Sequence, residues 1–206
     1  MPLTLTGAAG STINLGTNGS IAGLAVGGVP DGTVDADALA SNAVTSGKLA
    51  SGVGGKFASY AVICDQKAHD TSGGTFTSGD WRDRDLNTEI ADPDGIVSIS
   101  SNQFTLGAGT YLINWSCPAY RVEEHRSRLY DVTGSAVLAV GFNAWSADSD
   151  RPQGWSEGFF RHTITSNNVY KLQHFCLDSY VNGFGRSGNI DDTVEKYSWV
   201  KIYKEA

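Results

Sequence analysis

The chain has little of what membrane proteins and small metal-binding modules require. Its 206 residues contain no apolar run of about 18 residues, so we expect no membrane insertion. Three cysteines are present without a CxxC pair, which argues against zinc ribbons and thioredoxin-like redox motifs. We expect Cys64, Cys117 and Cys176 to be buried free thiols. A Cys117–Cys176 bridge is the alternative, although cytosolic assembly keeps thiols reduced.

Charge is also scarce. Charged residues make up 18% of the chain and the net charge is −7, which disfavours a nucleic-acid partner because phosphates repel it. The first residues lack a basic region followed by an apolar core, so we expect no signal peptide and synthesis in a host cytoplasm. Hydrophobic residues make up 40%, enough for a core, and the 25 glycines favour strands and turns over helices.

The clearest strand pattern lies between Ser100 and Tyr130. From Tyr111 to Cys117, large apolar side chains alternate with neighbours on the opposite face, which predicts a half-buried β-strand. Phe104-Thr-Leu106 forms a shorter run, and Gly107-Ala-Gly109 between the two runs predicts a hairpin turn. Pro118 is expected to end the strand, because proline cannot donate a hydrogen bond to a neighbouring strand.

Similar short runs recur to the end of the chain. From Tyr197 to Tyr203, three aromatic residues and Lys201 alternate with Ser198, Val200 and Ile202, which predicts two opposite faces. Turn residues separate the runs, so the sequence predicts an all-β sandwich or jelly roll. Further strands are expected at 57–64, 96–100, 128–131, 137–142, 159–165 and 169–178, the last two joined as a hairpin across 166–168.

One group of motifs resembles a known family. The run FTLGAGTYLINWSCP, followed by SRLYD, is similar to the central signature of the C1q/TNF-like jelly-roll family, in the version found at the C-termini of bacteriophage virion appendage proteins. The resemblance implies an all-β jelly-roll head whose last strand is central, a homotrimer, and attachment to the virion by the N-terminus. It extends over about Phe57 to Glu205. The other matching pieces are Asp85-Leu-Asn87-Thr88, Tyr170-Lys-Leu-Gln-His174, Gly183-Phe-Gly185 and Tyr197 to Ile202.

We expect three regions in the chain. Residues 1–33 are low in charge and rich in small residues, and they cannot bury enough apolar surface to fold alone. They are either a flexible terminus or an anchor that becomes ordered against other virion proteins, and the resemblance favours the anchor. Residues 34–55 form a stalk or linker, and residues 56–206 form the head.

The stalk prediction depends on a repeat. Apolar residues recur every five positions at Val34, Leu39, Val44 and Leu49. Five residues turn a straight helix by about 500°, so this period keeps neither one helical face nor strict strand alternation. We interpret it as an oligomeric stalk in which several chains share their apolar rows, because a repeat cannot bury its face alone. The alternative is a simple linker.

Motifs for metal, cofactor or redox chemistry are not convincing. Gly183 to Gly188 matches G-x-G-x-x-G, but no helical pattern follows it, so we expect a loop and no cofactor. The four histidines show no HExxH or other close ligand spacing, so no metal site is predicted. His174 lies inside a predicted strand and is expected to be packed and hydrogen-bonded. The alternating charges from Arg82 to Asp85 suit a solvated edge or an intersubunit ion-pair network.

The candidate ligand-binding residues lie in one loop. Between Trp145 and Trp155, aromatic faces suited to stacking on sugars accompany side chains that can hydrogen-bond hydroxyls. The alternative is that both tryptophans are structural, at a subunit interface. No motif of two carboxylates facing each other is present, so we predict no catalytic residue. The tentative binding set is Trp145, Asp148, Asp150, Arg151 and Trp155.

These observations together predict a homotrimeric virion structural protein rather than an enzyme. A tail fibre or tail-associated appendage that recognises a host cell-surface glycan or protein is the first choice. A capsid-surface fibre or decoration protein is the alternative within the same class. A small glycan depolymerase is less favoured because of the missing carboxylate pair, and a secreted C1q-like ligand because of the missing signal peptide.

Overall fold

The computed structural model describes residues 44, 48, 55–147, 153–188 and 190–206. The chain divides into two units, Met1–Gly54 and Gly55–Ala206. In the first unit, Val44 is about half exposed. The expected anchor, residues 1–33, and the stalk positions Val34, Leu39 and Leu49 lie outside the described residues. The fold below is therefore that of Gly55–Ala206.

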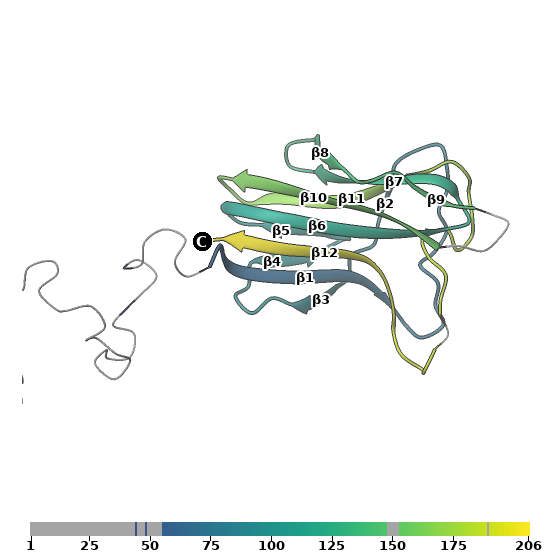
Figure 1. The fold of residues 1–206 in the computed structure, drawn as a ribbon, viewed down its shortest axis with the longest axis horizontal. Coiled ribbons are helices and arrows are strands. Elements are labelled where there is room, and N and C mark those ends of the chain that lie inside the picture. The colour runs from purple at the N-terminus through teal and green to yellow at the C-terminus, as the bar shows by residue number, and fades with distance from the viewer. Residues whose placement is uncertain (1–43, 45–47, 49–54, 148–152, 189) are drawn as a thin grey trace, which may run out of the picture. The chain divides into compact units, whose positions relative to one another are not determined.

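Two antiparallel sheets make up this unit (Figure 1). The first sheet has the strand order β10-β6-β12-β1-β3. The second has the order β4-β5-β11-β7-β8, with β2 paired to β11 and β9 paired to β7. The bounds are β1 (Phe57–Lys67), β2 (Arg82–Asp83), β3 (Thr88–Ala91), β4 (Val97–Ser100), β5 (Gln103–Leu106), β6 (Gly109–Tyr120), β7 (Glu123–Asp131), β8 (Ala136–Val140), β9 (Ala144–Ser146), β10 (Gln153–Ile164), β11 (Asn168–Cys176) and β12 (Glu195–Glu205).

The main core lies between the sheets and is built from the alternating residues. Ile113 of β6 and Ile202 of β12 face Leu129 and Leu172 from the second sheet, and all four side chains are fully buried. Burying a side chain of this size contributes roughly 1.5–3 kcal/mol. The predicted faces of the last strand are confirmed from Ser198 to Tyr203, since Ser198, Val200 and Ile202 are buried, but Tyr197 on the other face is buried as well. The period of two in the sequence therefore predicted which side chains of these strands face the core.

Consecutive strands cross between the sheets instead of forming the expected hairpins. Leu106 at the end of β5 pairs with Asn168 in the second sheet, whereas Gly109 at the start of β6 pairs with Ile164 in the first. The strands on either side of 166–168 also belong to different sheets. Both hairpin predictions are therefore wrong, because alternation identifies a strand but not its partner. The crossing pattern is that of a double-sheet jelly roll, which confirms the predicted all-β class.

Pro118 does not end its strand as expected. β6 continues to Tyr120, and Pro118 pairs with Trp155 of β10. The pairing of β6 with β12 stops at Ser116, so beyond that point β6 has a strand partner on one side only. Proline is tolerated there because the side without a partner needs no N–H donor.

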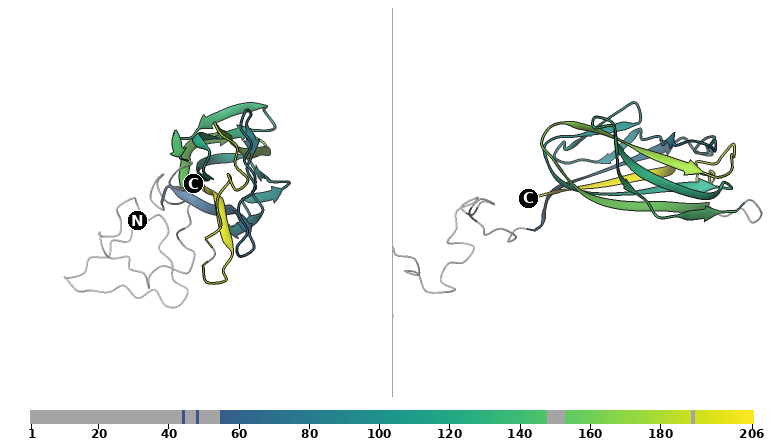
Figure 2. Two further views of the ribbon diagram at one scale, coloured as in Figure 1. Left: turned by 90° about the vertical axis from the view of Figure 1, so that its right-hand side faces the viewer. Right: turned by 90° about the horizontal axis from the view of Figure 1, so that it is seen from above.

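The last strand is central, as expected from the family resemblance. Ile202 pairs with Ile113 on one side and with Ala61 on the other. The C-terminus meets the start of the unit, where the Ala206 amide donates to the Lys56 carbonyl at 3.0 Å. Figures 1 and 2 show the C-terminus at one end of the sandwich and long connecting loops at the other. We call the second end, formed by the β6–β7 turn and residues 177–188, the distal end.

The described residues contain no helix that is both long and apolar enough to cross a membrane.

Candidate functional site

The outward side of the first sheet carries large apolar side chains. Register places Leu112, Tyr203 and Tyr60 in one row across β6, β12 and β1. Phe159 of β10 lies one row further along, and Trp199 of β12 lies beyond it. Phe159 is 65% exposed and Tyr60 is 47% exposed. We call these five residues the aromatic face.

A hollow of about 220 Å³ lies on this face beside Phe159 and Trp199. Phe142 closes one side, and its backbone is fixed because its amide donates to the Glu157 carbonyl at 2.7 Å. The Ser156 hydroxyl donates to the Phe142 carbonyl, also at 2.7 Å. The hollow is therefore shaped by the fold itself. Its polar lining residues include Asn114, Ser116, Glu157 and Lys201, so both signs of charge are present.

A buried arginine, Arg84, bonds to three segments that lie far apart in the sequence. Arg84 is 1% exposed and donates from Nε to the Ser198 hydroxyl at 2.7 Å. Its Nη1 and Nη2 donate to the carbonyls of Pro118 and Phe184, at 3.2 and 2.8 Å. Burial lowers the pKa of this guanidinium. The expectation that Arg84 lies on a solvated edge or in an intersubunit network is wrong, because these three acceptors draw it into the interior.

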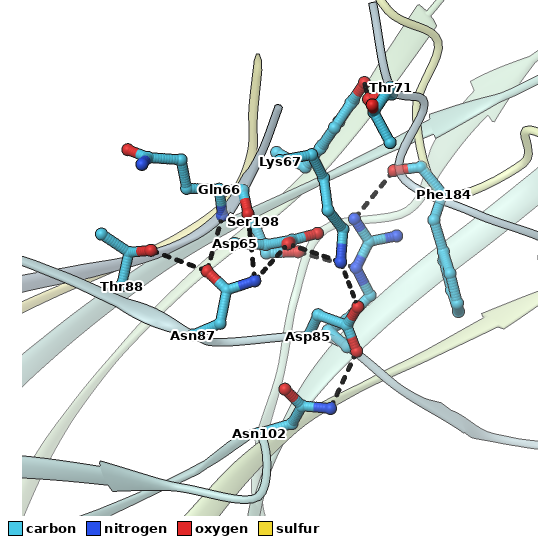
Figure 3. A network of polar contacts seen from close by, with 12 residues as sticks. Asp65, Gln66, Lys67, Thr71, Asp85, Asn87, Thr88, Asn102, Phe184 and Ser198 are labelled. Carbon is cyan, nitrogen blue, oxygen red and sulfur yellow. Dashed lines mark hydrogen bonds and ion pairs between the residues drawn. The ribbon is translucent and has the colours of Figure 1, made fainter. Parts of the chain in front are cut away.

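A second polar group explains the Asp85-Leu-Asn87-Thr88 motif. Asp65 is 1% exposed, accepts a hydrogen bond from Asn87 Nδ2 at 3.2 Å and forms an ion pair with Lys67 at 3.1 Å. The Lys67 ammonium also bonds to Asp85, which accepts a further bond from Asn102 at 2.9 Å. Burial raises the pKa of Asp65. The two carboxylates are thus joined through one ammonium group, as Figure 3 shows.

Two histidines on neighbouring strands, His125 of β7 and His174 of β11, form a buried pair. His125 Nδ1 and His174 Nε2 are 2.9 Å apart, and the two residues are 3% and 0% exposed. The prediction that His174 is packed and hydrogen-bonded is confirmed. Burial, with a smaller contribution from Arg84, lowers the pKa of His125 to about 4 and that of His174 well below its usual value. Within the described residues, His125 Nε2 and His174 Nδ1 have no hydrogen-bond partner.

The cysteines behave as expected. Cys64, Cys117 and Cys176 are free and buried, so the alternative of a Cys117–Cys176 bridge does not hold. Burial raises the pKa of all three thiols, that of Cys176 to about 12. A thiol in this state is a small apolar residue and a poor nucleophile at neutral pH. The sequence Gly183 to Gly188 lies in a loop, as predicted.

The tentative ligand-binding residues are described only in part. Trp145 lies in β9 and Trp155 in β10, and they are 55% and 52% exposed. The two segments lie close together, since a Cβ added to Gly154 would be 2.5 Å from the Trp145 carbonyl oxygen. Asp148, Asp150 and Arg151 lie outside the described residues. Recognition by this loop therefore stays a prediction.

A polar cleft at the distal end had no counterpart in the sequence analysis. It has a volume of about 270 Å³ and is lined by Tyr120, Arg121, Tyr180, Asn182 and Arg186. Arg121 Nη1 donates to the Tyr180 hydroxyl at 3.1 Å, and Arg186 Nη1 donates to the Tyr120 hydroxyl at 3.0 Å. About 60 residues separate the two halves of this cleft in the sequence, so no local motif marks it. Only the fold brings them together.

No protein-family model and no curated protein sequence matches this chain. Among solved structures, the globular domain of zebrafish complement 1qA protein is 10% identical with a TM-score of 0.45, over 71% of this chain and 96% of that one. PRD1 vertex protein P5 is 12% identical with a TM-score of 0.49, over 73% and 99%. Murine APRIL is 5% identical with a TM-score of 0.44, over 71% and 98%. The likeness concerns the fold alone.

Proposed function

We propose that the chain is a homotrimeric structural protein of a virion. Residues 56–206 are the head, residues 34–55 the stalk and residues 1–33 the segment that binds other virion proteins. A tail fibre or tail-associated appendage that recognises a host surface is the first choice, and a capsid-surface fibre or decoration protein is the second. The resemblance of the sequence to phage appendage heads and the jelly-roll fold support this role.

The aromatic face is the observation that carries the proposal. Large apolar side chains that stay exposed on a sheet face commonly mark interaction sites, and here Tyr60 and Phe159 are exposed. We assign the occupant as a second copy of the same chain. The face offers Glu157 and Lys201 beside its apolar residues, so copies related by rotation can match opposite charges while they bury aromatic rings.

The stalk repeat supports three copies rather than two. Its apolar positions, Val34, Leu39, Val44 and Leu49, recur without fitting a single helical face or a strand. Shared rows around a threefold axis give each of these side chains a cover that one chain lacks. The family resemblance of the head favours the same symmetry.

The proposal assigns no catalytic residue. A glycoside hydrolase needs a general acid and a second carboxylate on opposite sides of a substrate. The neighbouring carboxylates Asp65 and Asp85 are joined through Lys67, and Asp65 is 1% exposed. This arrangement suits a structural brace for β1 and the residues before β3. It supports a binding role for the head over glycan cleavage.

Electron microscopy of virions labelled with an antibody against residues 56–206 tests the location. Label at the tail is expected, and label on the capsid surface selects the second location. The proposal would be overturned if the antibody bound the purified chain but did not bind virions. Denatured virions in a blot provide the control for an epitope that is merely hidden.

A further inference from the structure

The distal cleft gathers hydrogen-bond donors. The Arg121 and Arg186 guanidinium groups line it together with the phenols of Tyr120 and Tyr180. Each phenol oxygen already accepts a bond from a guanidinium, at 3.1 Å for Tyr180 and 3.0 Å for Tyr120. A phenol that accepts in this way still has its own O–H to donate.

The backbone at Arg121 is held in an unusual conformation. Its φ of +56° lies in the left-handed region, which costs a non-glycine residue roughly 1–2 kcal/mol. Glycine would adopt this φ at no such cost. Residues held in sparsely populated conformations cluster at ligand sites, where the surrounding structure fixes them. The β6–β7 turn thus projects a long cationic side chain from a position where glycine would be more stable.

The loop that carries Arg186 is fixed by the fold. The Tyr120 amide donates to the Gly183 carbonyl at 2.9 Å, and the Gly73 amide donates to the Gly185 carbonyl at 2.8 Å. Gly183 has no room for a side chain, since an added Cβ would lie 2.6 Å from the Phe76 Cβ. Arg84 holds the carbonyl of Phe184 between them. The cleft is therefore preorganised, which lowers the entropy cost of binding.

We propose that this cleft binds the oxyanion of an acidic sugar, a phosphate or a carboxylate. Two guanidinium groups provide planar forks that match either anion, and the phenols supply further donors. Arg121 and Arg186 come from segments about 60 residues apart, so the fold brings two guanidinium groups to one cleft. The distal end and the pair Lys56–Ala206 lie at opposite ends of the sandwich (Figure 1). A ligand bound at the distal end is therefore far from the first residues of this unit.

The anion site stands on the geometry of a single chain. The assignment of the ligand to a cell-surface polysaccharide rests on the proposed function. Such a site differs from the tentative set around Trp145 and Trp155, since it uses charge where that set uses stacking. Three linked copies of a weak site in one trimer would gain by avidity.

Calorimetric titration of the full-length chain at low ionic strength tests the site. Glucose 1-phosphate, glucuronate and glucose serve as probes with phosphate, carboxylate and no charge. Saturable binding of one or both anions is expected, with glucose at least about tenfold weaker. Tighter binding of glucose 1-phosphate identifies a phosphate ligand, and tighter binding of glucuronate a carboxylate ligand. Equal binding of all three probes, or none, would overturn the proposal.

Matched variants assign the binding to the cleft. Arg186→Gln removes one charge at an exposed position, and Arg121→Gly removes the other while it suits the positive φ. Each variant is expected to bind the anionic probe at least about tenfold more weakly than the wild-type chain does. Arg126→Gln is the control, because Arg126 of β7 bonds to Asn143 and does not line the cleft. An equal loss in the control would mean general electrostatics and would refute the site.

Light scattering on the same samples separates the two proposals. A trimer that binds neither anion refutes the cleft and leaves the virion role standing. A monomer that binds an anion through Arg121 and Arg186 supports the cleft and refutes the trimer.

Discussion

The outward faces of the two sheets carry different kinds of side chain. On the second sheet, Arg128 donates twice to Gln173, at 2.9 and 2.7 Å, and Gln173 donates to Asp83 at 2.8 Å. Lys171 bonds to the same Asp83 at 2.9 Å, and the Arg128 guanidinium lies 3.9 Å from the centre of the Trp81 ring. The polar groups of this face satisfy one another. It is suited to water.

The first sheet has the same alternation and also carries an ion pair on its outward side, Arg161 to Glu205 at 2.7 Å, but in addition it exposes large apolar side chains. Phe159, Tyr60 and Trp199 point outward there, and the fold shapes a hollow beside Phe159. Burial of one such ring against another copy contributes more than an exposed ion pair, which contributes roughly 0–1 kcal/mol. We infer from this difference that the polar groups of one face are satisfied within a single chain, whereas the other face is the proposed contact with another copy.

The largest effect should come from a charge placed on the aromatic face. Phe159→Asp would bury an uncompensated carboxylate at the proposed interface, which costs several kcal/mol per copy. We expect sedimentation velocity to show mainly single chains, with the circular dichroism of the folded head retained. Tyr130→Asp is the matched control, because Tyr130 lies on the second sheet beside Lys171. Dissociation by both variants, or by neither, would remove the distinction between the faces.

The next largest effect is expected on the stability of the fold, when the buried Arg84 is replaced. Arg84→Met leaves the carbonyls of Pro118 and Phe184 and the hydroxyl of Ser198 without this donor. Unsatisfied buried groups cost roughly 1–3 kcal/mol each, so we expect a loss of about 3–5 kcal/mol in the free energy of unfolding. Urea denaturation measures it. Arg82→Met, at a half-buried neighbour whose Nε donates to the Thr77 carbonyl at 3.1 Å, should cost only about 1 kcal/mol; a cost equal to that of Arg84→Met would contradict the account.

Acid should weaken the head through the histidine pair. Burial lowers the pKa of His125 to about 4 in the folded protein and lowers that of His174 as well, so the unfolded chain binds more protons below about pH 6.5. The contribution of the two histidines to the free energy of unfolding should therefore be constant above that pH and fall as pH drops from about 6.5 towards 4. The slope is at most about 1.4 kcal/mol per pH unit for each histidine.

Urea denaturation at a series of pH values measures this slope. His125→Gln should reduce it, whereas His162→Gln, outside the pair, should leave it unchanged. A slope that is the same in both variants would assign the acid sensitivity to other groups.

The smallest effect on stability is expected at the tryptophans near the distal end. Trp145 and Trp155 are about half exposed, so replacing both by Ala should change the stability of the head by less than about 1 kcal/mol per site. If the loop recognises a host glycan, adsorption to cells is lost while the trimer persists. A dissociated or unfolded head would instead assign both residues to structure.

Sequence patterns predicted the strands and their faces well. The last strand was placed from the alternation of Ser198, Val200 and Ile202, because a half-buried strand must show that period. The partners of strands were predicted less well. Whether the chain after Leu106 turns back on itself or crosses to the other sheet depends on which partner buries more surface. No alternation within a strand contains that information.

The sequence predicted little of the candidate site, because its residues come together only when the chain folds. Arg84 stands in a run of alternating charges typical of a surface, and its burial depends on acceptors at Pro118, Phe184 and Ser198. Arg121 and Arg186 likewise meet only after folding. Single long-range contacts of this kind leave no periodic trace. The motif Gly183-Phe-Gly185 was the available signal, since close backbone approach often requires glycine.

The mass of the wild-type chain in solution tests the central claim most directly. Multi-angle light scattering at micromolar concentration should give three times the chain mass of 21.8 kDa. That result, together with dissociation of the Phe159→Asp variant, would mean that the aromatic face is covered by other copies. A stable mass of 21.8 kDa at the same concentration would contradict the account, because the face would then be exposed in the working protein.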